Sequence, residues 1–553
     1  MVEETIDTVL VRILDCSLPH HDHVTVVDAA SSNNDHKLPM RSMKAKLKLI
    51  AYLLKDLGIS ECQSYFQKIL KALQASQDDP TRKNQAIEFL AMEGRFFDRL
   101  YPQDQTTLLL SLHHFQNLQE LELWSMNRLS LRTLCQGIAK IPSLSRLGLG
   151  GVKLYHFANC HDCLAQHPGL KSVFLSHFSF REDLAESDVA NENDVATNSM
   201  ILLDSFLVAL GSCLSLERLE IYQSQEPPTT QLWSDIGMVG LARSKTLKSL
   251  TLRQINLSLQ SFQGFALNLT DEMPLQMLDL SVNNLGNDEG DSWQTSFLAP
   301  IVKHRHIKTL SLRQNGLSAR SCKALCTALM STSRTEIDDS TNSDKDKKPQ
   351  PPSLEGLVLS DNPLGDQGAT ALADLLRPAS TVRLKHLGLK VTGLTDVGCV
   401  YLAHALAGNT SLQSLTLFGN HMTDASYVAF GETLRMYKET SQLKDLNIHT
   451  EPRNISRTGC KALLDMVKEN YTIMNLTTPL RMRRPRGYHG EYGSDIEVFI
   501  ALNNAGRKKL FRAGLADDNL PTKRDWIDAI DSVQPYFNAV VYLVRANPSI
   551  CCR

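Results

Sequence analysis

The chain has 553 residues, a formal net charge of −2 and 21% charged residues. This balance excludes a general, strongly basic nucleic-acid binder and an acidic solvating chain. No apolar run approaches the roughly 18 residues that a membrane-spanning helix needs. The start, MVEETIDTVLVRILDC, is acidic where a secretory signal would be basic. We therefore expect a cytoplasmic or nuclear protein that binds neither membrane nor nucleic acid.

The first 102 residues contain at least two helical patterns. In residues 44–58 and 84–100, apolar residues recur at three- and four-residue spacing. We predict that residues 1–102 form an N-terminal helical cap, which would cover the open end of the repeats that follow. Whether this segment also holds a degenerate first strand, from His23, is left open. A separate signalling domain is the alternative.

From Leu118 onward, one short pattern recurs about twelve times. It reads LQELEL at 118, LKSLTL at 247 and LKHLGL at 384, and its other copies start at 144, 170, 216, 275, 307, 354, 412, 443 and 471. Positions one, four and six are apolar. A unit that cannot bury this apolar face alone must stack on copies of itself, so residues 103–480 are predicted to form a solenoid.

Most intervals between repeat starts are 26 to 32 residues, which leaves room for a helix after each strand. Residues 354–376, LEGLVLSDNPLGDQGATALADLL, contain the whole unit: a strand, the turn residue Asn362, Leu364 and a helix. Asp366 is predicted to cap that helix through the free amides of its first turn. The corresponding place in other repeats is held by Asp396, Asp424, Ser318 and Ser456.

With these features, the repeats resemble the ribonuclease-inhibitor-like class of leucine-rich repeats. The resemblance covers roughly two-thirds of the chain. It implies an α/β solenoid of horseshoe form, with a parallel concave β-sheet, convex helices and helical caps. The asparagine expected at position nine is present at Asn283, Asn315, Asn362 and Asn420. Other residues replace it elsewhere, so residues 275–434 are predicted to be the most regular part.

The cysteines are predicted to be reduced and buried. Cys322, Cys399 and Cys460 fall at the inner side of successive helices, where cysteine packs as a small hydrophobic residue. His156, Cys160, Cys163 and His167 have a spacing that resembles zinc ligation. The repeat register places them at packing positions instead, so we predict core packing, no metal and no cofactor.

Three segments interrupt or follow the repeats. Residues 181–199 and 331–353 are polar and rich in turn formers, and we interpret them as surface insertions, with docking or phosphorylation as the alternative. Residues 481–553 are predicted to be a basic linker and a C-terminal cap. The cluster RMRRPR at 481–486 is either a solvated charge run or a localisation signal.

The exposed strand face is the predicted binding surface. Strand alternation places positions three, five and seven of each repeat on the concave side. Aromatic residues and arginines dominate binding energy at protein interfaces, although such aromatics can also simply pack on the next strand. The candidate partner-binding residues, all at position seven, are Trp124, Tyr222, Arg253, Arg313, Lys390, Phe418 and His449. We predict that Arg313 is the main anchor and that reversing its charge leaves stability unchanged.

The sequence contains no P-loop, HExxH or GxSxG motif. We therefore predict a monomeric, non-enzymatic scaffold that binds a protein partner through the concave face. The alternative is a Ran-type GTPase-activating protein or another regulator of a small GTPase. Ran regulators resemble this chain in their long repeats, but they typically carry an acidic tail where this chain has a basic stretch. The sensor part of an innate-immunity receptor is a third hypothesis, against which the lack of a P-loop argues.

Overall fold

The computed structural model describes residues 89–93, 102–112, 118–125, 131–151, 164–177, 203–223, 234–286, 297–331, 353–451, 455–480, 488–511 and 521–548. These residues belong to two compact units. Unit 1 is Met1–Asn256 with Gln260–Leu275, and unit 2 is Leu257–Leu259 with Gln276–Arg553. The predicted strand from His23, the insertion at 181–199, most of the insertion at 331–353 and the basic cluster at 481–486 lie outside the described residues.

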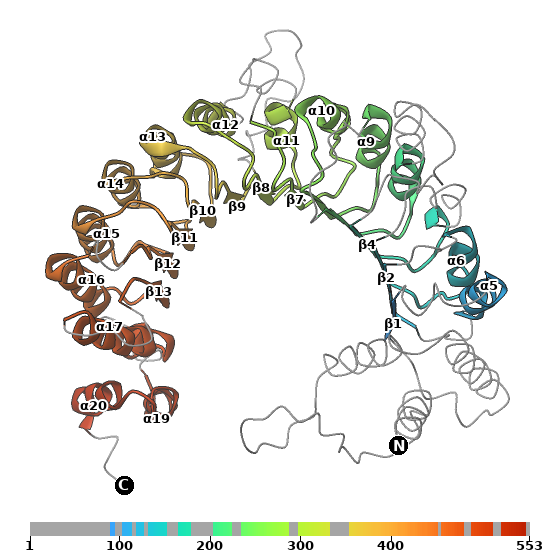
Figure 1. Cartoon of the computed structure of the whole chain (residues 1–553). Coiled ribbons are helices and arrows are strands. Elements are labelled where there is room, and N and C mark those ends of the chain that lie inside the picture. The colour runs from blue at the N-terminus through green and yellow to red at the C-terminus, as the bar shows by residue number, and fades with distance from the viewer. Residues whose placement is uncertain are drawn as a thin grey trace, which may run out of the picture. The chain divides into compact units, whose positions relative to one another are not determined.

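Unit 1 consists of parallel strands that follow one another in chain order, and its helices cover one face of this layer of strands (Figure 1). The strands are β1 (Phe89–Glu93), β2 (Glu120–Trp124), β3 (Arg146–Gly150), β4 (Ser172–Ser176), β5 (Arg218–Tyr222) and β6 (Ser249–Arg253). The helices are α5 (Pro102–Ser111), α6 (Leu131–Ile138), α9 (Asp235–Ala242) and α10 (Leu259–Asn268).

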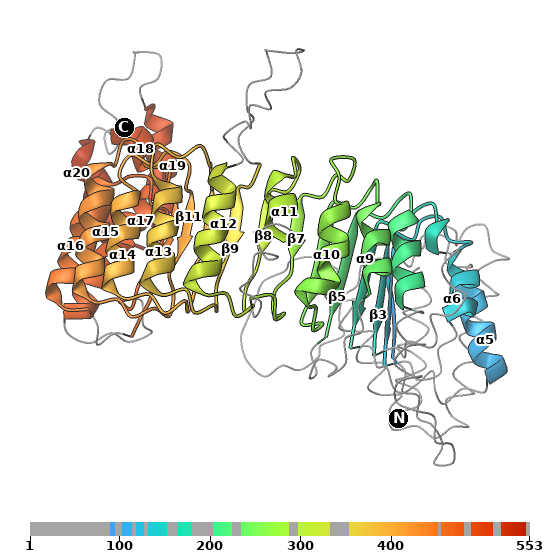
Figure 2. The same cartoon turned by 90° about the horizontal axis from the view of Figure 1, so that it is seen from above.

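Unit 2 has the same order of elements with shorter strands, and α12 to α16 lie side by side as one layer (Figure 2). The strands are β7 (Met277–Asp279), β8 (Thr309–Ser311), β9 (Gly356–Val358), β10 (His386–Gly388), β11 (Ser414–Thr416), β12 (Asp445–Asn447) and β13 (Asn475–Thr477). The helices between them are α11 (Ala299–Lys303), α12 (Ala319–Ser331), α13 (Gly365–Leu376), α14 (Asp396–Ala405), α15 (Asp424–Met436) and α16 (Arg457–Glu469).

The repeated leucines form the core, as the sequence predicts. In the repeat that starts at Leu384, the side chains at positions one, four and six are at most 2% exposed. The same positions are buried in the other described repeats. Both units therefore have the architecture of a leucine-rich repeat solenoid, with parallel strands on one face and helices on the other.

Two repeat boundaries differ from the sequence interpretation. Residues 84–100 were expected to be helical, but Phe89–Glu93 is strand β1, with Leu90 level with Leu121 of β2. The expectation was wrong because the apolar residues at positions one, four and six of a repeat include a three-residue interval, which also occurs in an amphipathic helix. In this segment the three positions are Ile87, Leu90 and Met92. At the other end, Leu476 is level with Leu446. The last repeat therefore starts at the fully buried Ile473 and not at Tyr471.

The helix starts in unit 2 are linked from one repeat to the next. The Asp366 carboxylate accepts hydrogen bonds from the backbone amide and hydroxyl of Thr395, at 2.8 and 2.6 Å, and from the amide of Gly398 at 3.0 Å. Thr395 is the N-cap of α14, whereas the N-cap of α13 is Leu364 and has no side-chain cap. The prediction that Asp366 caps its own helix was therefore wrong. Because Asp366 already lies inside the first turn of α13, its side chain reaches the neighbouring helix instead.

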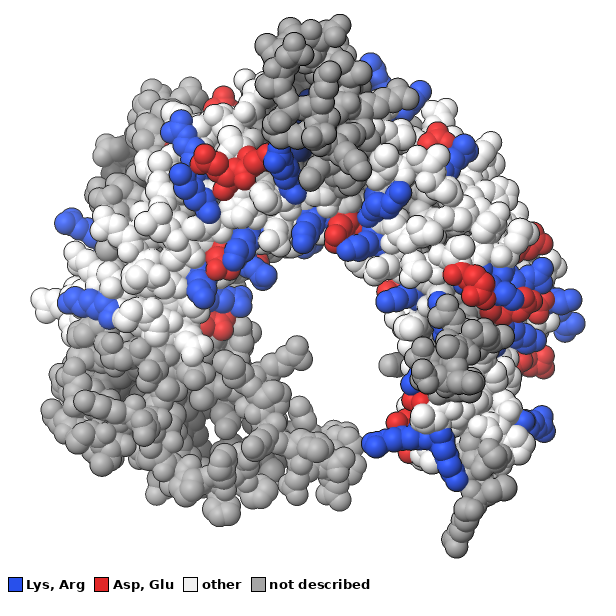
Figure 3. All heavy atoms as spheres, turned by 180° about the vertical axis from the view of Figure 1, so that it is seen from behind, with Lys and Arg blue, Asp and Glu red and all other residues white. Residues whose placement is uncertain are grey.

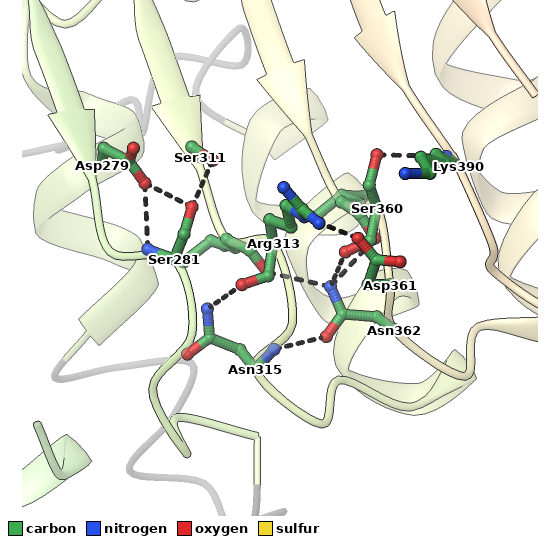
Figure 4. Close-up of polar contacts among 11 residues, drawn as sticks. Asp279, Ser281, Ser311, Arg313, Asn315, Ser360, Asp361, Asn362 and Lys390 are labelled. Carbon is green, nitrogen blue, oxygen red and sulfur yellow. Dashed lines mark hydrogen bonds and ion pairs between the residues drawn. The ribbon is translucent and has the colours of Figure 1, made fainter. Parts of the chain in front are cut away.

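The asparagines at position nine hold neighbouring turns together. The Asn362 side-chain oxygen accepts from the backbone amides of Asn315 and Leu317, at 2.8 and 3.0 Å (Figure 4). Its amide group donates to the carbonyls of Leu312 and Leu359, both at 2.9 Å. Each such side chain satisfies backbone groups of its own repeat and of the preceding one, which fixes the geometry where the strands end.

The residue after position seven has a left-handed backbone in most described repeats. Its amide donates to the position-seven carbonyl of the next repeat, for example from Asp361 to Lys390 at 2.7 Å and from Val391 to Phe418 at 2.8 Å. This conformation suits the glycine that holds the place at Gly419, but Val391 adopts it with φ 51°. For a β-branched residue the left-handed region costs roughly 1–2 kcal/mol. These bonds extend the parallel strand pairing beyond the ends of the strands, so the position-seven residues of neighbouring repeats lie side by side.

Four helices follow the last strand: α17 (Tyr488–Asn504), α18 (Arg507–Phe511), α19 (Lys523–Ser532) and α20 (Phe537–Ala546). Arg507 joins them to α16. It is 2% exposed, and its guanidinium group lies 4.5 Å from the ring centroid of Tyr471 and 4.8 Å from that of Phe499. The same group donates to the carbonyls of Val467, at 3.0 Å, and Lys468. One buried cation thus satisfies the end of α16 and packs between aromatic rings.

Candidate protein-interaction surface

The seven predicted partner-binding residues lie at the ends of strands and are all half-buried. Trp124, Tyr222 and Arg253 are the last residues of β2, β5 and β6 in unit 1. The other four follow their strands by two residues in unit 2: Arg313 after β8, Lys390 after β10, Phe418 after β11 and His449 after β12. We call these residues the position-seven row. They form separate groups in the two units.

In unit 1, Trp124 lies over the neighbouring strand. A Cβ atom added at Gly150 would be only 2.2 Å from the Trp124 ring, so glycine at this place makes room for the indole. The indole N–H donates to Glu122 at 3.1 Å, and the ring centroid is 6.1 Å from that of Phe174. Glu122 and Phe174 occupy position five, which the sequence analysis places on the same side, but Phe174 was not among the candidates because only position seven was read as a row.

Tyr222 lies between two side chains. The Arg253 guanidinium is 5.4 Å from the centroid of its ring, and the His177 ring meets it edge to face at 5.9 Å. The buried Nε of Arg253 has no hydrogen-bond acceptor among the described residues. The positive charge of Arg253 is thus held over an aromatic face.

In unit 2, Arg313 is neutralised. Its Nε lies 2.5 Å from the carboxylate of Asp361, with 38% and 21% of the two side chains exposed (Figure 4). Asp361 occupies position eight, where strand alternation gives no guide to side-chain direction. The sequence prediction that Arg313 is the main anchor, with no role in stability, therefore missed its acidic partner.

Lys390, Phe418 and His449 form a continuous contact across three strands. The Lys390 ammonium lies 5.2 Å from the centroid of the Phe418 ring. The His449 ring stacks against the same ring, with centroids 5.4 Å apart. Lys390 makes no ion pair with any residue that the structure describes. Because β11 lies between β10 and β12, Lys390 and His449 approach Phe418 from opposite sides.

Ion pairs neutralise several other cations near the strand face. Lys385 pairs with Glu355 at 2.8 Å, and Arg146 pairs with Glu120 at 3.4 Å. Among the described residues of the face shown in Figure 3, basic and acidic side chains are interspersed. The charges of Lys385 and Arg146 are thus balanced by neighbouring carboxylates.

Of the four residues whose spacing resembles zinc ligation, the structure describes only His167. Both nitrogens of its ring make hydrogen bonds within the protein. Its Nε2 lies 3.1 Å from the Ile138 carbonyl, and its Nδ1 accepts from the Gly169 amide at 3.2 Å. Burial lowers the pKa of His167 and favours the neutral ring. His156, Cys160 and Cys163 lie outside the described residues. Within the described ranges, no group of three or more His, Cys, Asp or Glu side chains could hold a metal ion.

The predicted burial is confirmed for the cysteines that the structure describes. Cys322, Cys399 and Cys460 are free thiols with 0% exposure. Burial raises the pKa of Cys399 to about 12 and that of Cys460 to about 11, so both remain protonated at neutral pH. None of the described helices has the length and apolar character required to cross a membrane.

Comparison with known proteins finds leucine-rich repeats. The family model described as Leucine Rich repeat matches residues 350–373 and 408–431, which contain Asn362 and Asn420. The chain is 28% identical over 290 residues to NACHT, LRR and PYD domains-containing protein 5 of Homo sapiens, covering 50% of this chain and 22% of the relative. It is 28% identical over 231 residues to ribonuclease inhibitor of Mus musculus, covering 42% and 44%. The chain thus spans less than half the length of either relative.

Among solved structures, the chain is similar to one described as the crystal structure of the Rad7 and Elc1 complex in yeast. The sequence identity is 15% and the TM-score is 0.35, with 77% of this chain and 96% of that chain covered.

Proposed function

We propose that this chain, a leucine-rich repeat protein of the ribonuclease-inhibitor-like class, is a non-enzymatic scaffold that binds a protein partner through the exposed face of its strands. It would act as a monomer in the cytoplasm or nucleus, with the residues before β1 and residues 481–553 as caps. Ribonuclease inhibitor is, by its name, a protein that acts on another protein, which supports a binding role for these repeats.

The contact of Lys390, Phe418 and His449 is the observation that carries the proposal. Aromatic side chains that are half-buried and fixed by their neighbours lose little conformational freedom on binding, and such residues dominate protein interfaces. Seven parallel strands at about 4.8 Å spacing give unit 2 a strand face about 29 Å long. A patch of this length fits a standard interface, which buries roughly 800 Å² per partner.

The test is affinity capture from cell extract with the full chain as bait, followed by mass spectrometry. One variant combines Tyr222→Ala with Arg253→Glu in unit 1, and another combines Lys390→Glu with Phe418→Ala in unit 2. Lys461→Glu, an exposed site on α16, is the matched control. We expect at least one strand-face variant to lose a partner that the wild type and the control retain. Retention of every partner by both folded variants would place binding on the caps or the helix face.

A GTP-hydrolysis assay separates the scaffold from the Ran-type alternative. The scaffold proposal expects that adding the full chain leaves the hydrolysis rate of small GTPases unchanged. A GTPase-activating protein would instead raise that rate by several orders of magnitude, as activators that stabilise the phosphoryl-transfer transition state do.

A further inference from the structure

Within the position-seven row of unit 2, Lys390 differs from Arg313 in its charge balance. Arg313 donates to Asp361, so that pair presents little net charge to a partner. Lys390 lies over the ring of Phe418 and makes no ion pair with a described residue. An aromatic face attracts the ammonium group but does not cancel its charge. Within this row, Lys390 would therefore attract an anion of a partner more strongly than Arg313 does.

Phe418 is fixed in place before any partner arrives. Lys390 covers it from β10 and His449 stacks on it from β12, so both neighbours restrict the rotation of the ring. The next position-seven residue beyond Lys390 is the small Ser360, on the repeat of β9. The ammonium group therefore has only a small side chain on that side, which leaves room for a partner's side chain.

Val391 supplies a second observation, because it is an apolar side chain that is 45% exposed beside this contact. Its left-handed backbone at φ 51° recurs at the equivalent place in most described repeats, for example at Val282 and Gln314, so that conformation belongs to the repeat geometry. The amide of Val391 donates to the Phe418 carbonyl at 2.8 Å, which ties the exposed apolar side chain to the aromatic residue.

We propose that Lys390, Val391, Phe418 and His449 form an acid-anchor site, which receives a carboxylate side chain and a nearby apolar side chain of a protein partner. The carboxylate contacts the Lys390 ammonium, and the apolar side chain contacts Val391 and the edge of the Phe418 ring. This inference rests on the proposed scaffold function. A carboxylate fits better than a phosphate, because the site has one ammonium group and none of the clustered arginines that bind phosphorylated segments.

The experiment selects peptides from a random displayed library on the immobilised full chain. We expect selected peptides to combine Asp or Glu with an apolar residue at a fixed spacing. Lys390→Glu should weaken a selected peptide at least about tenfold, and Val391→Gly should weaken it severalfold. The Val391→Gly protein should melt at an unchanged or higher temperature because glycine relieves the backbone strain. Lys461→Glu should bind the peptide as the wild type does.

Two results of the selection would overturn the site. One is a library that yields no peptide above background, and the other is a set of peptides that bind folded Lys390→Glu as tightly as the wild type. Tighter binding of a phosphoserine version than of the glutamate version would replace the carboxylate with a phosphate. The proposed function is judged separately by extract capture. A partner that depends on Tyr222 and Arg253 but not on Lys390 would refute the acid-anchor site and leave the scaffold intact.

Discussion

The carboxylate of Asp366, in the first turn of α13, accepts hydrogen bonds from both the amide and the hydroxyl of Thr395, the N-cap of α14. The same relationship joins Asp396 to Thr423 one repeat further on. The first turns of α14 and α15 therefore each donate hydrogen bonds to an aspartate of the preceding helix. Stability at one helix start depends on the repeat before it.

Replacing Asp366 with alanine should destabilise unit 2 by about 1–2 kcal/mol, because it removes three acceptor contacts from the start of α14. Hydrogen exchange should show the loss at the amides of α14 more than at those of α13. Asp374→Ala is the matched control, since Asp374 on the same helix makes an exposed ion pair with Arg377 and does not cap α14. Equal exchange changes in the two helices would contradict the linkage between repeats.

Asp396 should contribute a pH-dependent part of stability. Burial alone would raise its pKa, but hydrogen bonds from Ser426 and Thr423 outweigh burial and lower the pKa. The folded pKa therefore lies below the unfolded value of about 3.9. Its contribution is present above that value and is lost as the pH falls through the folded pKa. Denaturant titrations should find Asp396→Asn less stable than the wild type at pH 7, with the difference shrinking below about pH 4.

The control for the pH series is Asp374→Asn, which removes one carboxylate from an exposed place. Asp525 also loses a stabilising contribution as the pH falls, since the hydrogen bond from Lys509 and those of its capping box hold its pKa at about 2. Comparing each variant with the wild type at the same pH cancels that background. A difference for Asp396→Asn that stays constant down to strongly acidic pH would refute the assignment.

Arg313→Glu should lower stability as well as alter the binding surface. The sequence alone suggested no effect on stability, but the ion pair with Asp361 means that the substitution places two carboxylates together. Because both groups are partly exposed, we expect a loss of about 1 kcal/mol or less. Adding Asp361→Arg should restore most of it in a double-mutant cycle. Independent, additive effects of the two substitutions would show that the pair contributes nothing.

Arg507→Lys should loosen the C-terminal helices from α16. Lysine cannot reach both carbonyls while lying flat between the rings of Tyr471 and Phe499, so we expect a loss of about 2–3 kcal/mol. Faster hydrogen exchange in α17 to α20 is the expected readout. Arg545→Lys, at an exposed position on α20, should change exchange little. Unaltered exchange in Arg507→Lys would mean that apolar packing alone holds the cap.

The sequence predicted the leucine core because burial follows a fixed spacing, as at Leu384 and its partners in each repeat. It could not predict that Asp361 pairs with Arg313, because the left-handed backbone at position eight turns the side chain out of the strand alternation. It also could not show that Gly150 makes room for Trp124, since that contact crosses between strands. Phe89–Glu93 was misassigned because a short apolar run fits both a strand and a helix.

The spacing of the position-seven row has a consequence for the shape of a partner. Neighbouring strands lie about 4.8 Å apart, so Lys390, Phe418 and His449 repeat at that interval. An extended chain presents same-side residues every 6.6 Å or so, and it loses register with the row after about one repeat. An α-helix rises about 4.5 Å over three residues, which nearly matches the row. A partner helix that lies across the strands, with an acidic and an apolar residue three positions apart, therefore matches the spacing of this surface. An extended peptide does not match it.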